Sequence, residues 1–293
     1  MGKRFPDVLA MIFDGIPKGS TLNDFWEENV LHLSGRESTY FDDLLTVDDF
    51  RTLLTDRPFR REEIRFLKEG KDVTSSIIVK QKITLEEESI DELLKDGVSI
   101  VVSSLLLHNI KIRRACMVLR SSLSFPVQAN AYLSPPRSRA FDAHWDPHDV
   151  IVAQIAGSKS WFVESSPTRE LPLQRPDNYS VASDLFEATK PIRVSSGDTL
   201  YVPRGFAHRA ETGPDLSLHV TFPVQSTNWV DILRIAFEQA VDQVPLCRSA
   251  LPLGWQNHDE LFEQIEALAI RVFSEMEIPL RVSDAIASAK KEL

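Results

Sequence analysis

The clearest pattern in the chain is a helical one near its C-terminus. Between positions 226 and 244, apolar side chains recur every three or four residues, at Trp229, Leu233, Phe237, Ala240 and Val244. The same spacing returns further on, at Leu261, Ile265, Leu268, Val272 and Met276. Apolar residues at this spacing lie on one face of an α-helix. We therefore predict two amphipathic helices here, and a short third helix that starts at Ser283.

The first hundred residues mix helical and extended patterns. Residues 46–56 (TVDDFRTLLTD) begin with Thr46, a favoured residue at a helix N-terminus, and Asp49 stands where it can complete a capping box. We predict a helix over this stretch and another over residues 20–33 (STLNDFWEENVLHL). Residues 75–83 (SSIIVKQKI) are rich in β-branched side chains and predict a strand.

A further capped helix is predicted over residues 84–97 (TLEEESIDELLKDG). Thr84 and Glu87 have the spacing of a capping box. Gly97 is placed to end the helix, because glycine tolerates the left-handed backbone that often follows a helix C-terminus. The flank formed by residues 1–100 is therefore expected to contain both helices and strands.

From about residue 100 the pattern changes to short β segments separated by proline and glycine. Six stretches are strand-sized and rich in β-branched or aromatic residues: VSIVVSSLL, VQANAYL, VIVAQIA, KSWFVE, DTLYVP and LSLHVTFPV. Many short strands of this kind are typical of a sandwich or barrel, with a jelly roll among the options. Residues 165–190 show little periodicity, and a connection of this length is often a functional rim loop.

These patterns divide the chain into the mixed flank, a β-rich core over residues 101–225 and a helical region over residues 226–293. An α+β fold fits this order. The helical region is too short to build much core alone, and both of its first two helices carry wide apolar faces. We therefore expect the surplus apolar surface to cover the barrel or a second subunit.

Composition narrows the class of protein. The chain has 293 residues, of which 43% are hydrophobic and 26% charged, as is ordinary for a globular protein. Its apolar runs are far shorter than a membrane span, and we expect neither a membrane partner nor a signal peptide. With only Cys116 and Cys247 there is no disulfide framework, so we expect a cytoplasmic location. A net charge of −10 argues against nucleic acid, whereas an acidic surface attracts a basic protein partner.

Candidate metal chemistry begins at residues 144–146 (HWD). In an extended segment alternate side chains point the same way, so His144 and Asp146 can converge on one ion. The motif is weak alone, but a third candidate follows at His208, after a Pro-Arg-Gly turn. Two histidines and one carboxylate form the facial triad of non-haem Fe(II) oxygenases, which leaves coordination positions open.

These segments together resemble the JmjC-type, cupin-fold 2-oxoglutarate oxygenases, and most closely the ribosomal oxygenases. The family pattern is Asn-x-Tyr, His-x-Asp, Gly-x-Lys-x-Trp and Pro-Arg-Gly-x-x-His. It is matched by Asn130, Tyr132, His144, Asp146, Gly157, Lys159, Trp161, Pro203, Arg204, Gly205 and His208. The resemblance implies a double-stranded β-helix (jelly-roll) core within an oxygenase domain over residues 1–225. It also implies that residues 226–293 form a dimerisation region, and hence a homodimer.

The resemblance also implies roles for single residues. The Fe(II) ligands would be His144, Asp146 and His208. The distal carboxylate of 2-oxoglutarate would pair with Lys159, with hydrogen bonds nearby from Asn130, Tyr132 and Thr221. A dicarboxylate taken into a barrel does need a cation to offset its desolvation. The family's usual serine two positions after the threonine is Pro223 here, which has no hydroxyl and so alters this side of the pocket.

The implied activity is hydroxylation of a side chain of a protein or peptide, with O2 consumed and succinate and CO2 released. Three alternatives stay open. The substrate could be a natural-product precursor peptide or a small molecule, since we do not expect the family's winged-helix domain in a chain of this length. A metal-dependent cupin enzyme without 2-oxoglutarate would have no reason to keep Lys159 with Asn130 and Tyr132. A catalytically silent binding module would not need an intact triad.

The remaining polar residues near the motifs have plainer interpretations. His148 and Asp149 could orient a metal ligand, but capping the start of the following strand is the favoured reading. His219 shares a strand face with Thr221 and is evenly balanced between packing and supporting the site. Arg204 in the Pro-Arg-Gly turn is expected to be structural.

Overall fold

The computed structural model describes residues 8–77, 81–174, 183–186, 189–243 and 245–251, together with a few single positions. The chain divides into two compact units, residues 1–225 and residues 226–293. Within the described residues no helix is long and apolar enough to cross a membrane.

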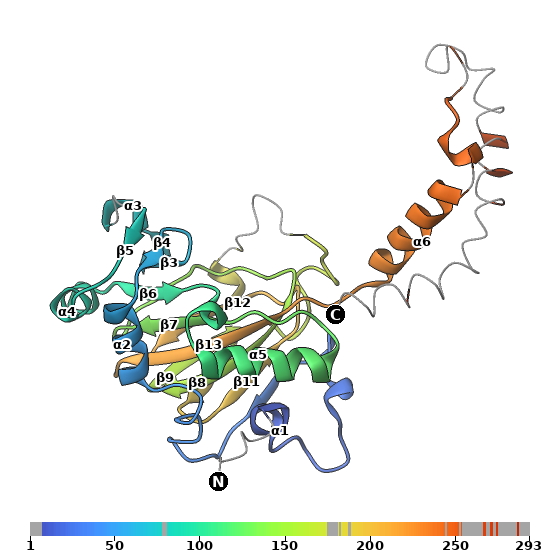
Figure 1. Ribbon diagram of the computed structural model, residues 1–293. Helices are drawn as coiled ribbons and strands as arrows, with labels where there is room; N and C mark the ends of the chain where they lie inside the picture. The colour runs from blue at the N-terminus through green and yellow to red at the C-terminus, as the bar shows by residue number, and fades with distance from the viewer. Residues whose placement is uncertain are drawn as a thin grey trace, which may run out of the picture. The chain divides into compact units, whose positions relative to one another are not determined.

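The first unit is built on two antiparallel β-sheets (Figure 1). Across the larger sheet the strands run β1 (Leu31–Leu33), β11 (Thr199–Val202), β8 (Asp149–Ala156), β13 (Ser217–Val224), β7 (Asn130–Ser134), β6 (Ser99–Val102), β3 (Ile64–Lys68) and β4 (Lys71–Asp72). The smaller sheet runs β10 (Ile192–Ser195), β9 (Ser158–Val163) and β12 (His208–Thr212). A separate pair is formed by β2 (Phe59–Arg60) and β5 (Lys82–Ile83).

Alternation along β8 shows how the sheets pack. Ile151, Ala153 and Ile155 face the large hydrophobic core on one side of the larger sheet. Val150 and Val152 face the opposite way, into a second core shared with apolar residues of β9, β10 and β11. A strand buried on both faces reads as a continuous apolar run, as this one does. The second core therefore fills the space between the two sheets of a jelly roll.

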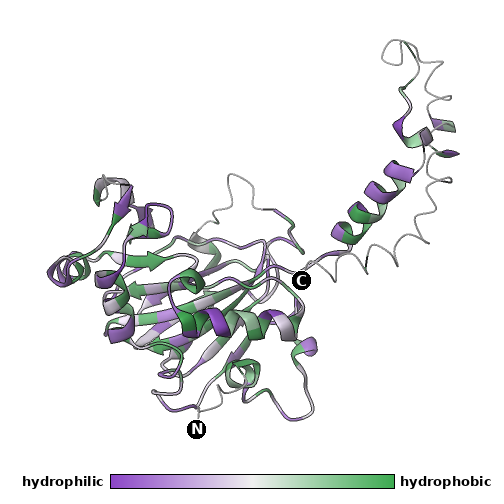
Figure 2. Cartoon of the chain, in the orientation of Figure 1, coloured by the Kyte–Doolittle hydropathy of each residue, from purple (hydrophilic) through white to green (hydrophobic). Residues whose placement is uncertain are grey.

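Helices cover the other face of the larger sheet. They are α1 (Val8–Phe13), α2 (Val47–Asp56), α4 (Glu87–Lys95) and α5 (Ile110–Leu123), and their buried residues all belong to the large core. Figure 2 shows strands that are largely hydrophobic and helices with mixed surfaces. The mixed surface follows from the helical period, which turns one face of each helix to the sheet and the other to solvent.

The predicted α+β class and double-stranded β-helix core are confirmed. Each of the six predicted strands overlaps a strand of the structure: β6, β7, β8, β9, β11 and β13. Helix α2 is also confirmed with its capping box, because the Thr46 hydroxyl accepts from the Asp49 N–H at 3.0 Å and the Asp49 carboxylate accepts from the Thr46 N–H at 3.2 Å.

Several local predictions in the flank are wrong. Helix α4 begins at Glu87 after an uncapped Glu86, so Thr84 does not cap it, although Gly97 does follow the helix with φ of 79°. Residues 20–33 form a 3-10 turn and the strand β1 instead of a helix, because β1 pairs with β11 far along the chain. Of the strand predicted over 75–83, the first residues belong to a helical turn, α3 (Thr74–Ile77), and β5 is the extended part among the residues that the structure describes there.

The second unit is described mainly through α6 (Trp229–Gln243), which confirms the first predicted C-terminal helix. Ala236 and Ala240 are buried, whereas Trp229, Leu233 and Phe237 are exposed. The second predicted helix and the one expected from Ser283 lie largely outside the described residues.

Candidate metal centre

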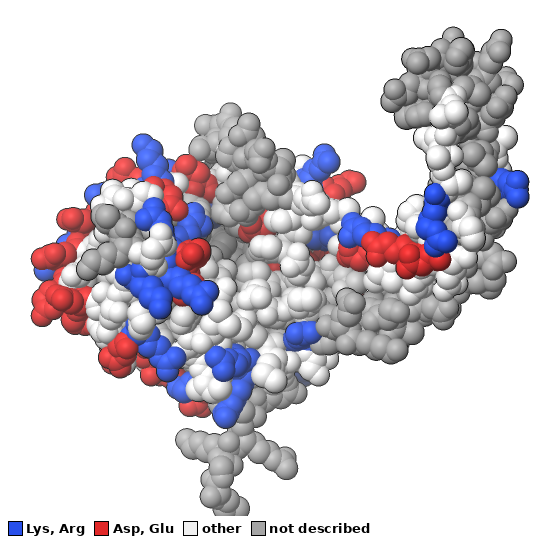
Figure 3. Space-filling view, turned by 45° about the horizontal axis from the view of Figure 1, so that its top comes forward, with Lys and Arg blue, Asp and Glu red and all other residues white. Residues whose placement is uncertain are grey.

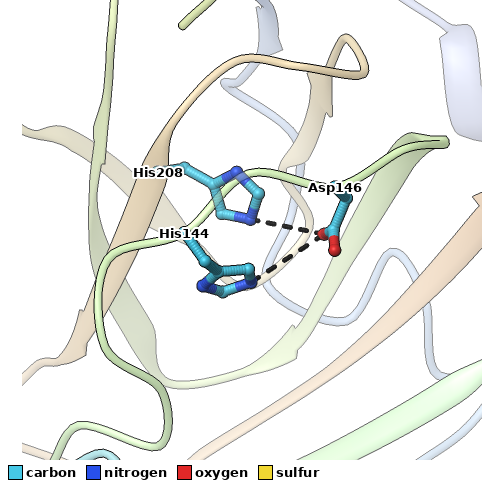
Figure 4. A group of neighbouring side chains, drawn as sticks. All are labelled: His144, Asp146 and His208. Carbon is cyan, nitrogen blue, oxygen red and sulfur yellow. Dashed lines mark ion pairs between the residues drawn. The ribbon is translucent and has the colours of Figure 1, made fainter. Parts of the chain in front are cut away.

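Three side chains converge beside the opening between the two sheets. His144 and His208 stand directly opposite each other, since each backbone N–H donates to the carbonyl oxygen of the other at 3.1 and 2.7 Å. The Nε2 atoms of His144 and His208 lie 3.9 and 3.6 Å from Oδ2 of Asp146 (Figure 4). Ligands about 2.1 Å from one ion lie roughly 3–3.5 Å apart in adjacent positions. The three groups are therefore close to the spacing that a single metal ion requires.

The hydrogen bonds of the imidazoles fix which nitrogen faces Asp146. His144 donates from Nδ1 to the carbonyl oxygen of Asp142 at 2.7 Å, and His208 donates from Nδ1 to that of Phe206 at 3.0 Å. A carbonyl oxygen can only accept, so each Nδ1 carries a proton, and in the neutral imidazole each Nε2 then presents a lone pair. This is the form in which imidazole binds a metal. Two imidazoles and one carboxylate also match the donor set of a non-haem Fe(II) site.

The Pro-Arg-Gly turn holds the two segments of the triad together. Gly205 has φ of 81°, and its N–H donates to the carbonyl oxygen of Asp146 at 2.8 Å. A Cβ at Gly205 would collide with the carbonyl oxygen of Arg169, so only glycine fits there. Arg204 is buried and pairs with Glu27 at 2.5 Å, as suits the structural role expected of it.

Asp149 and His148 follow the triad at the start of β8. The buried Asp149 carboxylate accepts from the Tyr201 hydroxyl at 2.7 Å and from the Arg204 N–H at 3.4 Å. It thereby ties β8 to the turn after β11, in keeping with a role at the strand start. His148 borders a cavity beside the triad, and burial lowers its pKa.

A cavity of about 230 Å³ adjoins the triad. Its walls come from both sheets: β7 and β13 of the larger sheet and β9 of the smaller one. Tyr132 is the register partner of His219 and Asn130 that of Thr221, so two cross-strand pairs face it. The cavity thus contains each residue that the sequence singled out for co-substrate binding.

Lys159 is the buried cation of this cavity. Its side chain is 2% exposed, and its ammonium donates to the Ser134 hydroxyl at 3.0 Å. It has no acidic partner among the described residues, and burial lowers its pKa to about 7. A buried ammonium of this kind is stabilised when an anion enters beside it.

Five further polar atoms belong to residues that line the cavity and have no hydrogen-bond partner in the described part of the chain: His148 Nδ1, Trp161 Nε1, Arg209 Nε, His219 Nδ1 and Thr221 Oγ1. Unpaired buried polar groups are costly, and a cluster of them indicates that a ligand or water supplies the missing partners. Together with Lys159 they suit a small anion rich in oxygen atoms. The residues present therefore fit a dicarboxylate.

His219 has a second role as part of an aromatic wall. Its ring stacks on Tyr132 with centroids 4.6 Å apart and planes 3° apart, and it meets the edge of Trp161 at 5.9 Å. Burial, and then the nearby Lys159, hold its pKa well below the usual range. His219 is therefore a neutral wall residue, and sequence reasoning had left this open.

Asn130 makes a hydrogen bond that the motif did not predict, and Arg65 lines the cavity without having been singled out in the sequence. Asn130 accepts the Ser104 N–H at 3.2 Å through its side-chain oxygen, so its amide nitrogen is the group left to donate elsewhere. Arg65 of β3 lines the cavity although no motif marks it. Only a pattern of long-range strand pairing could have revealed Arg65, and a single sequence does not display one.

Comparison with known families supports this site. Residues 104–232 match the family model described as the JmjC domain. The histidyl-hydroxylase NO66 of Drosophila melanogaster, also named a lysine-specific demethylase, is 31% identical over 263 residues, covering 84% of this chain and 39% of the relative. Ribosomal oxygenase 1 of Homo sapiens is 28% identical over 271 residues, covering 87% of this chain and 41% of the relative. The chain spans about two fifths of the length of these curated relatives.

Solved structures agree with the fold. The structure of E. coli ycfD has a TM-score of 0.53 at 18% identity, covering 88% of this chain and 67% of that chain. YcfD, a ribosomal oxygenase from Escherichia coli, in complex with cobalt and 2-oxoglutarate has a TM-score of 0.52 at 15% identity, covering 92% and 69%. At this level of identity the likeness concerns the fold.

Proposed function

Since the chain belongs to the JmjC-domain family of cupin-fold proteins, we propose that it is an Fe(II)- and 2-oxoglutarate-dependent oxygenase. It hydroxylates a side chain of a protein or peptide, with O2 consumed and succinate and CO2 released. The observation that carries this proposal is the meeting of the His-Asp-His triad with a cavity whose buried ammonium has no acidic partner in the described residues.

The triad would hold the metal through His144 Nε2, His208 Nε2 and Asp146. Bound Fe(II), with 2-oxoglutarate and O2, supplies the oxidising chemistry that inserts oxygen into a C–H bond. The protein's own part is to fix both imidazoles by their Nδ1–H bonds to backbone carbonyls. Neither imidazole then serves as an acid or base, because Nδ1 is committed to its carbonyl and Nε2 to the metal.

The co-substrate would enter between the sheets. Lys159 would bind its distal carboxylate, and the unpaired Thr221 hydroxyl stands on the facing sheet as a further partner. Asn130 and Tyr132 would complete the hydrogen bonding nearby. Pro223 borders the same cavity without a hydroxyl, so the unpaired nitrogen of His219 is the group that we expect to compensate. Pairing with the anion raises the pKa of Lys159 again.

The partners follow from the same proposal. Relatives named ribosomal oxygenases and a histidyl-hydroxylase support a protein substrate. A net charge of −10 favours encounter with a basic polypeptide. A cytoplasmic location is supported by the two cysteines, which are both free thiols.

A homodimer through residues 226–293 is also part of the proposal. On α6, Trp229 is 74% exposed, Leu233 47% and Phe237 46%. An apolar stripe of this width on one helix is typical of a surface that another helix covers. Twofold pairing of identical copies is the commonest way in which oligomers bury such surfaces.

Succinate formation tests the activity directly. Purified protein supplied with Fe(II), ascorbate and 2-oxoglutarate should release succinate slowly even without a polypeptide. Titration of 2-oxoglutarate into the metal-loaded protein should show binding. A protein that holds the metal but shows no binding of 2-oxoglutarate would contradict the proposal.

A further inference from the structure

The cavity beside the triad continues past the jelly roll toward the N-terminal strands. Arg65 of β3 pairs in register with Val101 of β6, Val101 with Tyr132 of β7, and Tyr132 with His219 of β13. Residues directly opposite one another in an antiparallel sheet share a face. Arg65 therefore points to the same side as the aromatic wall, and it lines the same cavity.

Phe141 stands between Arg65 and the metal ligands. Its ring centroid lies 5.7 Å from that of His144 and 6.1 Å from that of Tyr132. The guanidinium carbon of Arg65 lies 5.3 Å from the centre of the same ring. The ring of Phe141 is thus in contact range of both the triad and a cation.

The guanidinium of Arg65 uses only part of its hydrogen-bond donors within the described residues. Its Nε donates to Asp72 at 2.9 Å, and the Asp72 carboxylate is itself held by the N–H of Thr74 at 2.9 Å. Both members of the ion pair are about two-fifths exposed (41% and 43%), so the pair orients Arg65 more than it stabilises the fold. The two terminal nitrogens have no partner among the described residues. They form the planar fork that binds carboxylates and other acceptors.

The other charged residues of the cavity are accounted for. Asp146 belongs to the triad and Lys159 to the co-substrate. Arg209 also lines the cavity, but its guanidinium lies 4.4 Å from the ring of Phe162 and its Nη1 atom lies 3.7 Å from the Glu211 carboxylate. Figure 3 shows acidic and basic side chains intermixed on the face of the first unit that it displays. Among the residues lining the cavity, Arg65 and Arg209 are the cations besides Lys159, and Arg65 is the one that lies against Phe141. Asp146 of the triad is the one carboxylate in this lining, so a cationic substrate side chain would meet no free acidic partner there.

We propose that Arg65 and Phe141 form the subsite for the side chain that is hydroxylated, and that this side chain bears a hydrogen-bond acceptor. A carboxylate, a carboxamide or a neutral imidazole meets this description, whereas lysine and arginine do not. The ring of Phe141 packs against the apolar part of the side chain and Arg65 binds its polar end. This inference rests on the proposed function and names its substrate class. It is compatible with a basic polypeptide, because it concerns the reacting residue alone.

Isotope labelling tests the inference. The enzyme with Fe(II) and 2-oxoglutarate is incubated under ¹⁸O2 with peptides from a digested proteome, and mass spectrometry identifies the residue types that gain ¹⁸O. Label on Asp, Asn, Glu, Gln or His is expected. Label confined to Lys, Arg or apolar residues would overturn the inference and leave the oxygenase intact. Succinate release without label on any peptide would contradict protein hydroxylation as the activity. The inference about the reacting side chain would then fail together with the proposed function.

Variants separate recognition from folding. Arg65→Ala should lower ¹⁸O incorporation roughly tenfold or more, the effect of losing a charge-assisted contact. Its melting temperature and metal content should match those of the native protein, so a loss of incorporation would reflect recognition and not unfolding. Arg65→Lys should restore part of the incorporation, and Arg193→Ala, an exposed arginine on β10, serves as the matched control. Equal incorporation by Arg65→Ala and the native protein would contradict the subsite.

Discussion

Replacing Lys159 by methionine should change co-substrate binding and stability in opposite directions. The ammonium of Lys159 is fully buried and has only the Ser134 hydroxyl as its hydrogen-bond partner in the described structure. Methionine has a similar length and no charge, so Lys159→Met removes the partner of the distal carboxylate with little change in packing. A charge-assisted contact contributes about 1.5–3 kcal/mol, so the affinity for 2-oxoglutarate should fall roughly ten- to a hundredfold.

The effect on stability follows from the pKa. In the folded apoprotein the pKa of Lys159 is about 7, against an ordinary value of 10.5. Between these values the unfolded chain binds one proton more than the folded chain, so native stability rises with pH across this window. At about pH 7.5 the buried lysine lowers the free energy of unfolding by on the order of 4 kcal/mol, and Lys159→Met should recover much of this loss. The stability gain of Lys159→Met over the native protein should shrink by about 1.4 kcal/mol for each pH unit above about pH 7.5.

Two measurements check this reasoning. Chemical unfolding of the apoproteins between about pH 7 and 9 should give a stability difference that falls steadily with pH. Calorimetric titration of 2-oxoglutarate into the Mn(II)-loaded proteins without oxygen should show weaker binding by Lys159→Met. Native affinity should itself weaken above pH 7, because the ammonium form becomes scarcer. Lys190→Met, at an exposed position, is the control. A variant with unchanged affinity, or one destabilised at every pH, would refute the assignment of Lys159.

The other predictions concern the metal, the turn and the assembly. Asp146→Ala should abolish iron binding measured by metal analysis, because it removes the anionic ligand of the triad. His148→Ala should keep the metal. The reverse result would refute the ligand set. Gly205→Ala should lower the melting temperature and the metal content together, since a side chain there collides with backbone and disfavours φ of 81°. Light scattering should give twice the 33.2 kDa of one chain, and Leu233→Glu with Phe237→Glu should halve that mass; a native monomer would contradict the dimer.

Local patterns were sufficient where local geometry decides the outcome. The alternation of an extended segment placed His144 and Asp146 on one side, and the structure has their ligand atoms 3.9 Å apart. The buried strands β8 and β13 were recognisable because apolar β-branched residues run through them. Thr46 capped its helix because a capping box involves only residues three positions apart.

Other elements were missed because their stability comes from distant parts of the chain. Helix α5 buries Ile112, Ala115 and Leu119 against the sheet, but lysine and arginine between them weaken the apolar pattern. Strand β12 reads as polar and is nevertheless fixed by pairing with β9 and by the bridge between His144 and His208. Where tertiary pairing supplies the free energy, local propensity is a weak guide.

The sequence by itself determined the types of group present: two imidazoles and a carboxylate, a lysine and an amide at recognisable spacings. The tertiary structure alone decided where these groups meet. His208 reaches His144 only through pairing across the opening of the jelly roll, and burial between two sheets lowers the pKa of Lys159 to about 7. Arg65 joins the cavity through the register of β3, β6 and β7. Register between distant strands is set by the burial of whole sheet faces, which no short stretch of sequence contains.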